Sequence, residues 1–162
     1  MRLGDSDDID GAAQVWARAT AKRDGEVEIA PLEAAREVLV DSFQEDGSRF
    51  VVAANDGLIV GFGIAQPTKS SQAAEVRYVG VDPDFWGVGV GGMVLARMAD
   101  ELALAGFDSA ELLVYADNVA ARQLYERMGW TCDEREVSIH PRTGRPELRY
   151  RLALGGGHVS AA

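Results

Sequence analysis

The segment VDPDFWGVGVGG, residues 81–92, places four glycines within six positions. Glycine loses more conformational entropy on folding than any other residue, so ordering this segment is costly unless something must approach the main chain closely. An apolar strand-like run precedes the segment, and a regular helical pattern follows it. Glycines at such a junction indicate backbone N–H groups aimed at an anion, to which the helix N-terminus adds partial positive charge. The segment therefore predicts a phosphate-binding loop without a lysine or arginine of its own.

Two kinds of phosphate ligand fit this loop. Gly87, Gly89 and Gly92 match G-x-G-x-x-G, the dinucleotide fingerprint, and Asp117 follows at a plausible distance. In that fingerprint the first glycine follows the strand directly, whereas residues 82–86 intervene here. A hairpin also precedes the loop, where the fingerprint normally opens a βαβ unit. A dinucleotide-binding oxidoreductase stays an alternative. A loop without a ligand would not explain why the glycines end where a well-patterned helix begins.

The rest of the chain changes periodicity several times. Helices are predicted over about 8–23, from near Pro31, from the glycine segment to Gly106, and over 118–128. Strands are predicted over 48–55, 58–67, 74–81, 109–116, 135–140 and 147–154, the first two joined by a turn at Asn55-Asp56-Gly57. This order predicts one α/β (α+β) domain with a mixed sheet over residues 1–154. Residues 155–162 are predicted to be a disordered tail.

Composition excludes several classes of protein. The net charge of −10 argues against nucleic acid as a partner, although the same charge fits either a cationic ligand or simple solubility. No apolar run is long enough for a bilayer, and the acidic N-terminus lacks the apolar core of a signal peptide, so a cytoplasmic location without membrane contact is expected. A single cysteine, Cys132, excludes an intrachain disulfide, and with two histidines it leaves no predicted metal site.

Two motifs together resemble the acetyl-CoA-binding core of the GNAT superfamily of N-acetyltransferases. In that family a strand ending in Val-x-Pro leads to the loop Arg/Gln-x-x-Gly-x-Gly/Ala, and a later helix carries Asn, a Leu-Tyr pair and a Gly-Phe-like pair. The segments VGVDPDFWGVGVGGMVL and LLVYADNVAARQLYERMGW carry both motifs in that order. The matching positions are Val81, Asp82, Pro83, Gly89, Gly91, Asn118, Leu124, Tyr125, Gly129 and Trp130. The resemblance spans about residues 74–131.

The resemblance implies a mixed central sheet of about six to seven strands with splayed middle strands and about four helices. It implies acetyl-CoA as co-substrate and no metal. The positions it assigns to cofactor binding are Val79, Gly80, Val81, Trp86, Gly87, Val88, Gly89, Val90, Gly91, Gly92, Asn118 and Arg122, with Arg97 and Arg127 as alternatives to Arg122 for the 3′-phosphate. Gly80 fits a closely approaching ligand or a bulge equally well. Trp86 replaces the family's Arg or Gln and is expected to pack beneath the loop rather than stack on an adenine.

The resemblance also assigns catalytic roles. It makes Tyr125 the general acid that protonates the departing thiolate, although an aromatic core anchor is the alternative. Asn118 lies two helical turns before Tyr125 and is also a good N-cap. Glu75 would be a base acting on the amine through water, or only a solvated partner of Arg77. Strand alternation predicts that Glu75 shares a face with Val79 and Val81. A main-chain amide near Val81 is the candidate oxyanion donor.

These expectations combine into an N-acetyltransferase that moves an acetyl group directly to a primary amine of a small molecule or peptide. A non-catalytic acyl-CoA-binding or sensor module is the alternative with the same cofactor. In the family, the acceptor site is built by the segments corresponding to residues 22–31 and 139–146. The first is acidic and the second basic, so their charges do not identify the acceptor. Dimers are common in the family, so a homodimer is one expected assembly.

Overall fold

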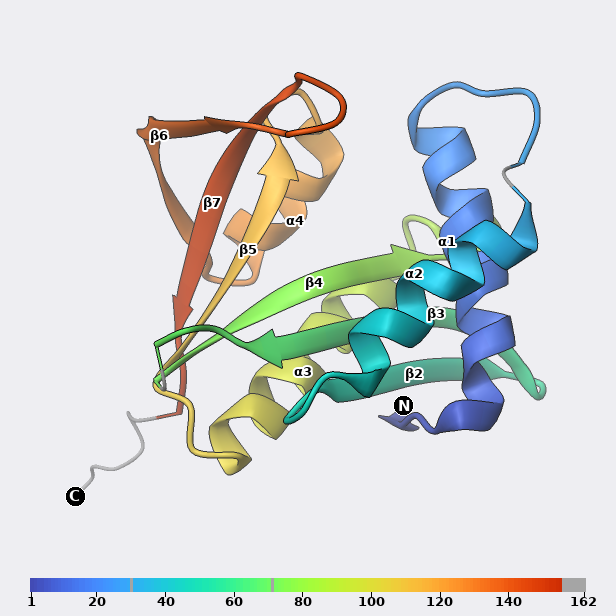
Figure 1. Cartoon of the computed structure of the whole chain (residues 1–162), viewed down its shortest axis with the longest axis horizontal. Coiled ribbons are helices and arrows are strands. Elements are labelled where there is room, and N and C mark those ends of the chain that lie inside the picture. Colours follow the sequence, from blue (N-terminus) through green and yellow to red (C-terminus); the bar gives the residue numbers. More distant parts are fainter. Residues whose placement is uncertain (30, 71, 156–162) are drawn as a thin grey trace.

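The structure, a computed structural model, describes residues 1–29, 31–70 and 72–155. Seven strands form one mixed sheet in the order β1-β2-β3-β4-β5-β7-β6 (Figure 1). The strands are β1 (Arg2–Leu3), β2 (Arg49–Asn55), β3 (Leu58–Pro67), β4 (Ala73–Val81), β5 (Ser109–Tyr115), β6 (Thr131–Ile139) and β7 (Pro146–Ala153). The helices are α1 (Ile9–Arg23), α2 (Leu32–Gln44), α3 (Val90–Leu104) and α4 (Val119–Arg127). The predicted tail lies outside the described residues, apart from Gly155.

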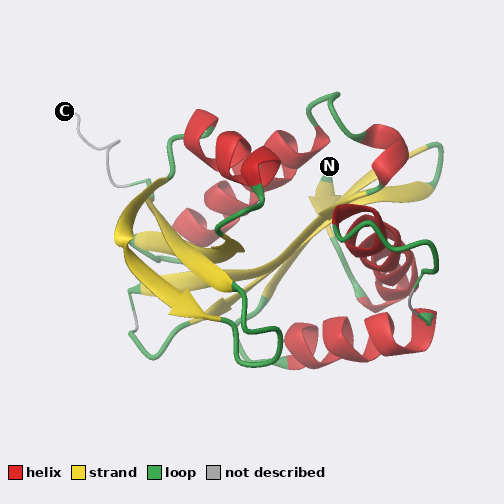
Figure 2. Cartoon of the chain, turned by 90° about the horizontal axis from the view of Figure 1, so that it is seen from above, coloured by secondary structure: helices red, strands yellow, loops and turns green. Residues whose placement is uncertain are grey.

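Helices cover both faces of the sheet (Figure 2). The apolar stripe of α1 is buried with α2 against Phe62 and Ile64 of β3. On the opposite face, α3 buries Leu95, Met98 and Leu102 in a core shared with β5 and β7. Burial of such stripes supplies most of the stability of helices in proteins, which is why the 3.6-residue period was informative. The predicted mixed sheet with four helices is confirmed.

The two middle strands, β4 and β5, pair only over a short stretch. Their parallel ladder comprises Ala73 with Ser109, Ala74 with Ala110, and Glu75 with Glu111. Beyond these pairs β4 stays on β3 and β5 stays on β7, so the strands diverge (Figure 1). We call residues 76–81 of β4 and 112–115 of β5 the wedge. Its closed end is where the two strands pair, and its open end, or mouth, is at Val81 and Tyr115. The splayed middle strands that the resemblance implied are confirmed.

A β-bulge lies at the closed end of the wedge. Ile64 opposes Tyr78 and Ala65 opposes Val76, so Arg77 is the extra residue. An extra residue shifts the alternation of side chains by one, which turns the following residues to the other face. Tyr78 therefore packs toward α1 and α2, whereas Val79 and Val81 pack toward α3. The prediction that Glu75 shares a face with Val79 and Val81 was wrong, because it assumed an unbroken period of two.

Other differences from the sequence-based expectation concern the ends of elements. Strand β6 begins at Thr131 rather than at 135, and its pairing with β7 is interrupted between Cys132 and Val137. Strand β1 has only two residues, too few to show a period. Among the described residues, no helix combines the length and the apolar character needed to cross a membrane.

Candidate active site

The four glycines of the loop serve two different purposes. Gly87 and Gly89 have φ of +81° and +93°, in the left-handed region that only glycine adopts without strain. A Cβ on either would meet nothing within 4 Å, so backbone conformation alone requires glycine there. Gly91 and Gly92 lie inside α3, where a Cβ would come within 3.0 Å of Leu124 and 3.4 Å of Met128, respectively. These two glycines let α3 approach α4 closely.

The loop leaves a run of backbone donors without protein acceptors. The first hydrogen bond of α3 runs from the Met93 N–H to the Gly89 carbonyl at 3.1 Å. Within the part of the chain that the structure describes, the N–H groups of residues 87–92 donate to no protein acceptor. Free N–H groups together with the partial positive charge of a helix N-terminus form a binding site for an anion. This arrangement has the donors that a diphosphate needs.

The edge of β4 presents further backbone groups to the wedge. The Asp82 N–H donates to the Val60 carbonyl at 2.8 Å, which makes these two residues a hydrogen-bonded pair. Because such pairs alternate along an antiparallel ladder, the N–H and C=O groups of Val79 and Val81 point away from β3 and into the wedge. The Val81 carbonyl accepts a hydrogen bond from the Trp86 indole N–H at 2.7 Å. An extended chain entering the wedge could pair with the remaining groups.

Gly80 lies between these two residues but faces the other way. A Cβ on Gly80 would come within 2.7 Å of the Phe62 ring. The bulge is at Arg77 rather than at Gly80. Close packing of Phe62 is therefore a sufficient reason for this glycine, and contact between Gly80 and a cofactor stays a prediction.

Trp86 does not pack beneath the loop as the sequence led us to expect. The residue is 42% exposed, and its indole N–H donates to the Val81 carbonyl. The ammonium of Lys22, at the end of α1, lies 4.9 Å from the centre of the ring. The packing prediction failed because the polar edge of the indole found a partner at the mouth of the wedge, which keeps the ring at the surface.

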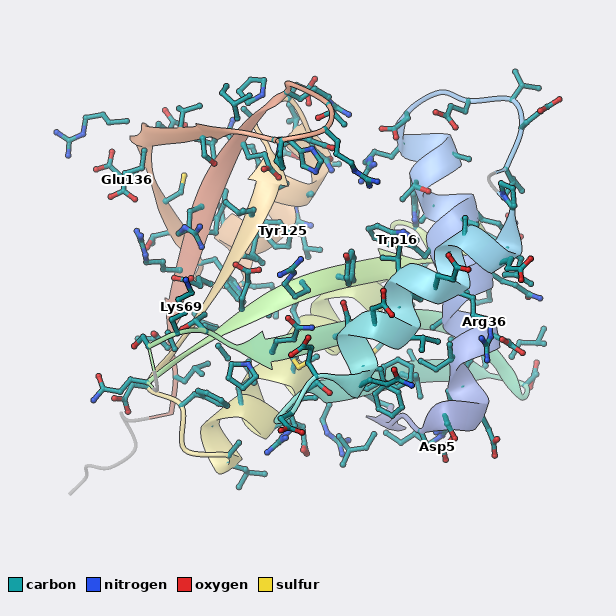
Figure 3. The ribbon with its side chains drawn as sticks, in the orientation of Figure 1. Asp5, Trp16, Arg36, Lys69, Tyr125 and Glu136 are labelled. Carbon is teal, nitrogen blue, oxygen red and sulfur yellow. The ribbon has the colours of Figure 1, made fainter. Side chains whose placement is uncertain are left out.

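Tyr125 lies on α4 with its ring near those of Trp130 and Tyr150, at 6.3 and 5.7 Å. In the projection of Figure 3 its side chain falls between the diverging strands β4 and β5, and it packs against the core shared by α3, β5 and β7. Burial raises the pKa of Tyr125 to about 12, against the opposing influence of the Arg23 cation. The hydroxyl donates to no acceptor among the described residues. Tyr125 is thus a protonated donor at neutral pH.

The other two predicted residues of this helix are held by the protein itself. The Asn118 side chain accepts from the Ala121 N–H at 3.3 Å, which confirms its role as N-cap. Arg122 donates to the Tyr150 hydroxyl at 3.0 Å, the Ala116 carbonyl at 3.0 Å and Glu134 at 2.6 Å. These bonds tie α4 to β6 and β7, and the contact of Arg122 with a 3′-phosphate stays a prediction.

Glu75 lies at the closed end of the wedge. Its carboxylate pairs with Arg77 at 3.2 Å and with Arg149 at 3.7 Å, and Arg149 also binds Glu111 at 2.9 Å. Val79 is four positions after Glu75, about 13 Å along an extended strand. Any proton transfer between Glu75 and a group near Val79 would therefore need intervening water.

The two segments expected to bind the acceptor meet across the open end of the wedge. Arg145 of the β6–β7 turn lies 3.5 Å from Asp24, which follows α1, and 2.9 Å from Asp117. The Tyr115 ring has Arg145 at 3.7 Å and Arg23 at 5.3 Å. The guanidinium of Arg23 and then that of Arg145 hold the pKa of Asp24 below its ordinary value. Sequence reasoning missed Tyr115 and Arg145, because nothing in a single strand or turn marks a contact between distant segments.

Comparisons with known proteins agree on one family. The sequence model described as "Acetyltransferase (GNAT) family" matches residues 14–130. A mycothiol acetyltransferase from Streptomyces griseus is 39% identical over 89 residues, which cover 55% of this chain and 29% of that protein. A mycothiol acetyltransferase from Brachybacterium faecium is 34% identical over 97 residues, covering 58% and 29%. The chain thus matches less than a third of the length of these relatives.

Solved structures share the fold over nearly the whole chain. The ribosomal-protein-S18-alanine N-acetyltransferase from Escherichia coli has a TM-score of 0.75 at 21% identity, covering 98% of this chain and 97% of its own. An acetyltransferase-like protein from Salmonella typhimurium, solved with its cofactor acetyl-CoA, has a TM-score of 0.76 at 17% identity, covering 99% and 96%. At such identities the likeness concerns the fold.

Proposed function

Because the chain belongs to the acetyltransferase (GNAT) family, we propose that it transfers an acetyl group from acetyl-CoA directly to a primary amine. Two features together carry this proposal: loop N–H groups without a protein acceptor among the described residues, and a protonated tyrosine, Tyr125, near the wedge. The loop would hold the diphosphate, and the backbone of Val79 and Val81 would hold the pantetheine arm in extended form. Acetyl-CoA, when bound, supplies the activated thioester.

Tyr125 is the proposed general acid. As the amine nitrogen bonds to the acetyl carbon, the carbon–sulfur bond breaks and the sulfur needs a proton, which the Tyr125 hydroxyl donates. Burial raises the pKa of Tyr125 to about 12, so its hydroxyl holds a proton at neutral pH before transfer. The proton that the amine nitrogen loses as the amide forms would restore the Tyr125 hydroxyl, which balances the step. A main-chain N–H near Val81 is the proposed donor to the acetyl oxygen.

Glu75 is the proposed base for the amine, acting through water. An alkyl ammonium group with a pKa near about 10.4 must lose a proton before attack. The ion pairs with Arg77 and Arg149 hold the Glu75 carboxylate on the α1 and α2 face of the sheet, the face toward which Tyr78 points. The proposed base and the proposed phosphate loop would then lie at opposite ends of the wedge, so amine and cofactor would approach from different directions.

The acceptor is proposed only as a class, a primary amine of a small molecule or a peptide. The curated relatives are named for mycothiol, and one structural neighbour is named for the alanine of a ribosomal protein. Both names fit a small acceptor or a free N-terminus.

A panel of amines, amino-acid derivatives, aminoglycosides and short peptides tests the proposal, with released CoA thiol as the readout. We expect turnover with at least one acceptor, and mass spectrometry should find the acetyl group on nitrogen. Binding of CoA without turnover on the whole panel would favour the acyl-CoA sensor. Thermal stabilisation by NAD(H) but not by acetyl-CoA would instead point to the dinucleotide alternative.

A further inference from the structure

We propose that Lys22, supported by the ring of Trp86, supplies the cation that the phosphate loop itself lacks. This inference rests on the proposed use of acetyl-CoA and adds a binding residue from α1, a helix outside both motifs of the resemblance. The loop has no lysine or arginine from Trp86 to Gly92, yet the diphosphate of CoA carries negative charge that N–H groups alone only partly offset.

The position of Lys22 fits this role. Its ammonium lies 4.9 Å from the centre of the Trp86 ring, and Trp86 directly precedes the N–H groups of residues 87–92. The indole is itself fixed by its hydrogen bond to the Val81 carbonyl at 2.7 Å, so the ring forms a platform at the mouth of the wedge. A cation over an indole ring keeps its remaining donors free for an anion.

Among the residues that the structure describes, the charged side chains next to Lys22 are paired, whereas the Lys22 ammonium is not. Arg18 binds Asp82 at 2.8 Å and Asp84 at 3.2 Å, which offsets one of the two negative charges beside the loop and engages the Arg18 guanidinium. Arg23 is held by Asp24 through two hydrogen bonds, at 2.9 and 3.0 Å. Within residues 1–29, 31–70 and 72–155, the Lys22 ammonium forms no ion pair with a carboxylate. An unpaired cation beside unpaired N–H donors is complementary to a phosphate group.

If Lys22 has this role, two parts of the protein bind two different parts of the cofactor. The wedge would hold the pantetheine arm whether or not Lys22 is present, whereas Lys22 would act only on the diphosphate end. Removing the ammonium should weaken binding of CoA about tenfold, the effect of losing one charged contact, and leave pantetheine binding unchanged. Because the contact is between charges, added salt should also weaken the binding of CoA less in the variant than in the parent protein.

The experiment measures binding of CoA and of pantetheine by calorimetry, which needs no acceptor. The full chain is compared with Lys22→Met, and with Lys69→Met as the matched control. The sequence contains only these two lysines. Lys69 follows β3 and lies near the closed end of the wedge, away from the loop (Figure 3). We expect the loss of affinity for CoA in Lys22→Met alone, with thermal stability unchanged in both variants.

A second variant guards against an indirect effect of the substitution. Trp86→Arg puts a guanidinium at the start of the loop, so in the Lys22→Met background it should recover most of the lost affinity for CoA. Chemical acetylation followed by mass spectrometry gives an independent readout, because bound CoA should protect Lys22 but not Lys69.

Three outcomes would overturn the inference: equal affinity of Lys22→Met and the parent protein for CoA, equal loss for CoA and pantetheine, or no protection of Lys22. Each of these presupposes that the parent protein binds CoA. Failure of the parent protein to bind CoA at all would instead contradict the proposed function, so the two proposals fail in different ways.

Discussion

The two sides of the wedge differ in what they present to a ligand. The β4 side, with the loop that follows it, offers backbone: the N–H groups of residues 87–92 and the edge groups of Val79 and Val81. The β5 side, with α4, offers side chains, above all the Tyr125 hydroxyl and the Tyr115 ring. Backbone groups depend on conformation, whereas side-chain groups depend on residue identity. The comparison predicts that substitutions on the β4 side alter binding and stability, apart from those of the proposed base Glu75 at the closed end, and that substitutions on the β5 side alter chemistry.

The largest effect is expected from Tyr125→Phe. Loss of the hydroxyl removes the proposed proton donor, so kcat should fall about 100-fold, the lower end of what general acid catalysis supplies. Affinity for CoA should change less than twofold, as measured by calorimetry. Tyr78→Phe is the matched control, because Tyr78 lies on β4 and packs toward α1 and α2. An unchanged kcat in Tyr125→Phe would contradict the assignment of chemistry to the β5 side of the wedge.

A second effect, on stability, is expected from Gly80→Ala. The new Cβ would lie within 2.7 Å of the Phe62 ring, which is fully buried and cannot move away freely. Such overpacking costs about 1–3 kcal/mol of the free energy of unfolding, measurable by chemical denaturation. Introducing Phe62→Leu as well should show a favourable coupling between the two sites in a double-mutant cycle. Additive effects would mean that Phe62 is not the reason for this glycine.

A somewhat smaller effect is expected at Gly89, where two variants distinguish backbone strain from loss of cofactor binding. Gly89→Ala and Gly57→Ala both place a side chain at positive φ, +93° and +81°, with nothing within 4 Å. Both should lose about 1 kcal/mol of stability through backbone strain. Only Gly89→Ala should also weaken binding of CoA, because Gly57 lies in the β2–β3 turn and not in the glycine loop. Equal affinity for CoA in the two variants would contradict a binding role for the loop backbone.

The smallest effect concerns alkaline pH. The pKa of Tyr125 is raised to about 12 in the folded protein, against about 10 for an exposed tyrosine, so the unfolded chain ionises first as the pH rises. The stabilisation is therefore complete below about pH 10 and is lost between about pH 10 and 12. At pH 10.5 the loss is about 0.8 kcal/mol. Denaturation at pH 8 and 10.5 should show this extra loss in the parent protein and not in Tyr125→Phe.

Local patterns in the sequence predicted much of the fold. The apolar stripes of α1 and α3, the Asn55-Asp56-Gly57 turn and the Asn118 cap were predictable, because each depends on residues a few positions apart. The alternation along β4 was predicted wrongly, because a bulge at Arg77 depends on the partner strand β3. The surface position of Trp86 was also missed, since its hydrogen bond to Val81 and its contact with Lys22 join three separate elements.

By itself, the sequence determined the kinds of element, the glycine loop at a strand–helix junction and the resemblance that identified Tyr125. These features follow from periodicity and from backbone preferences, which act over a few residues. Only the tertiary structure decided which face Glu75 occupies, why Gly91 and Gly92 lack side chains, and that Lys22 and Arg145 lie at the wedge. Such contacts depend on packing between segments far apart in the chain, and no local pattern encodes them.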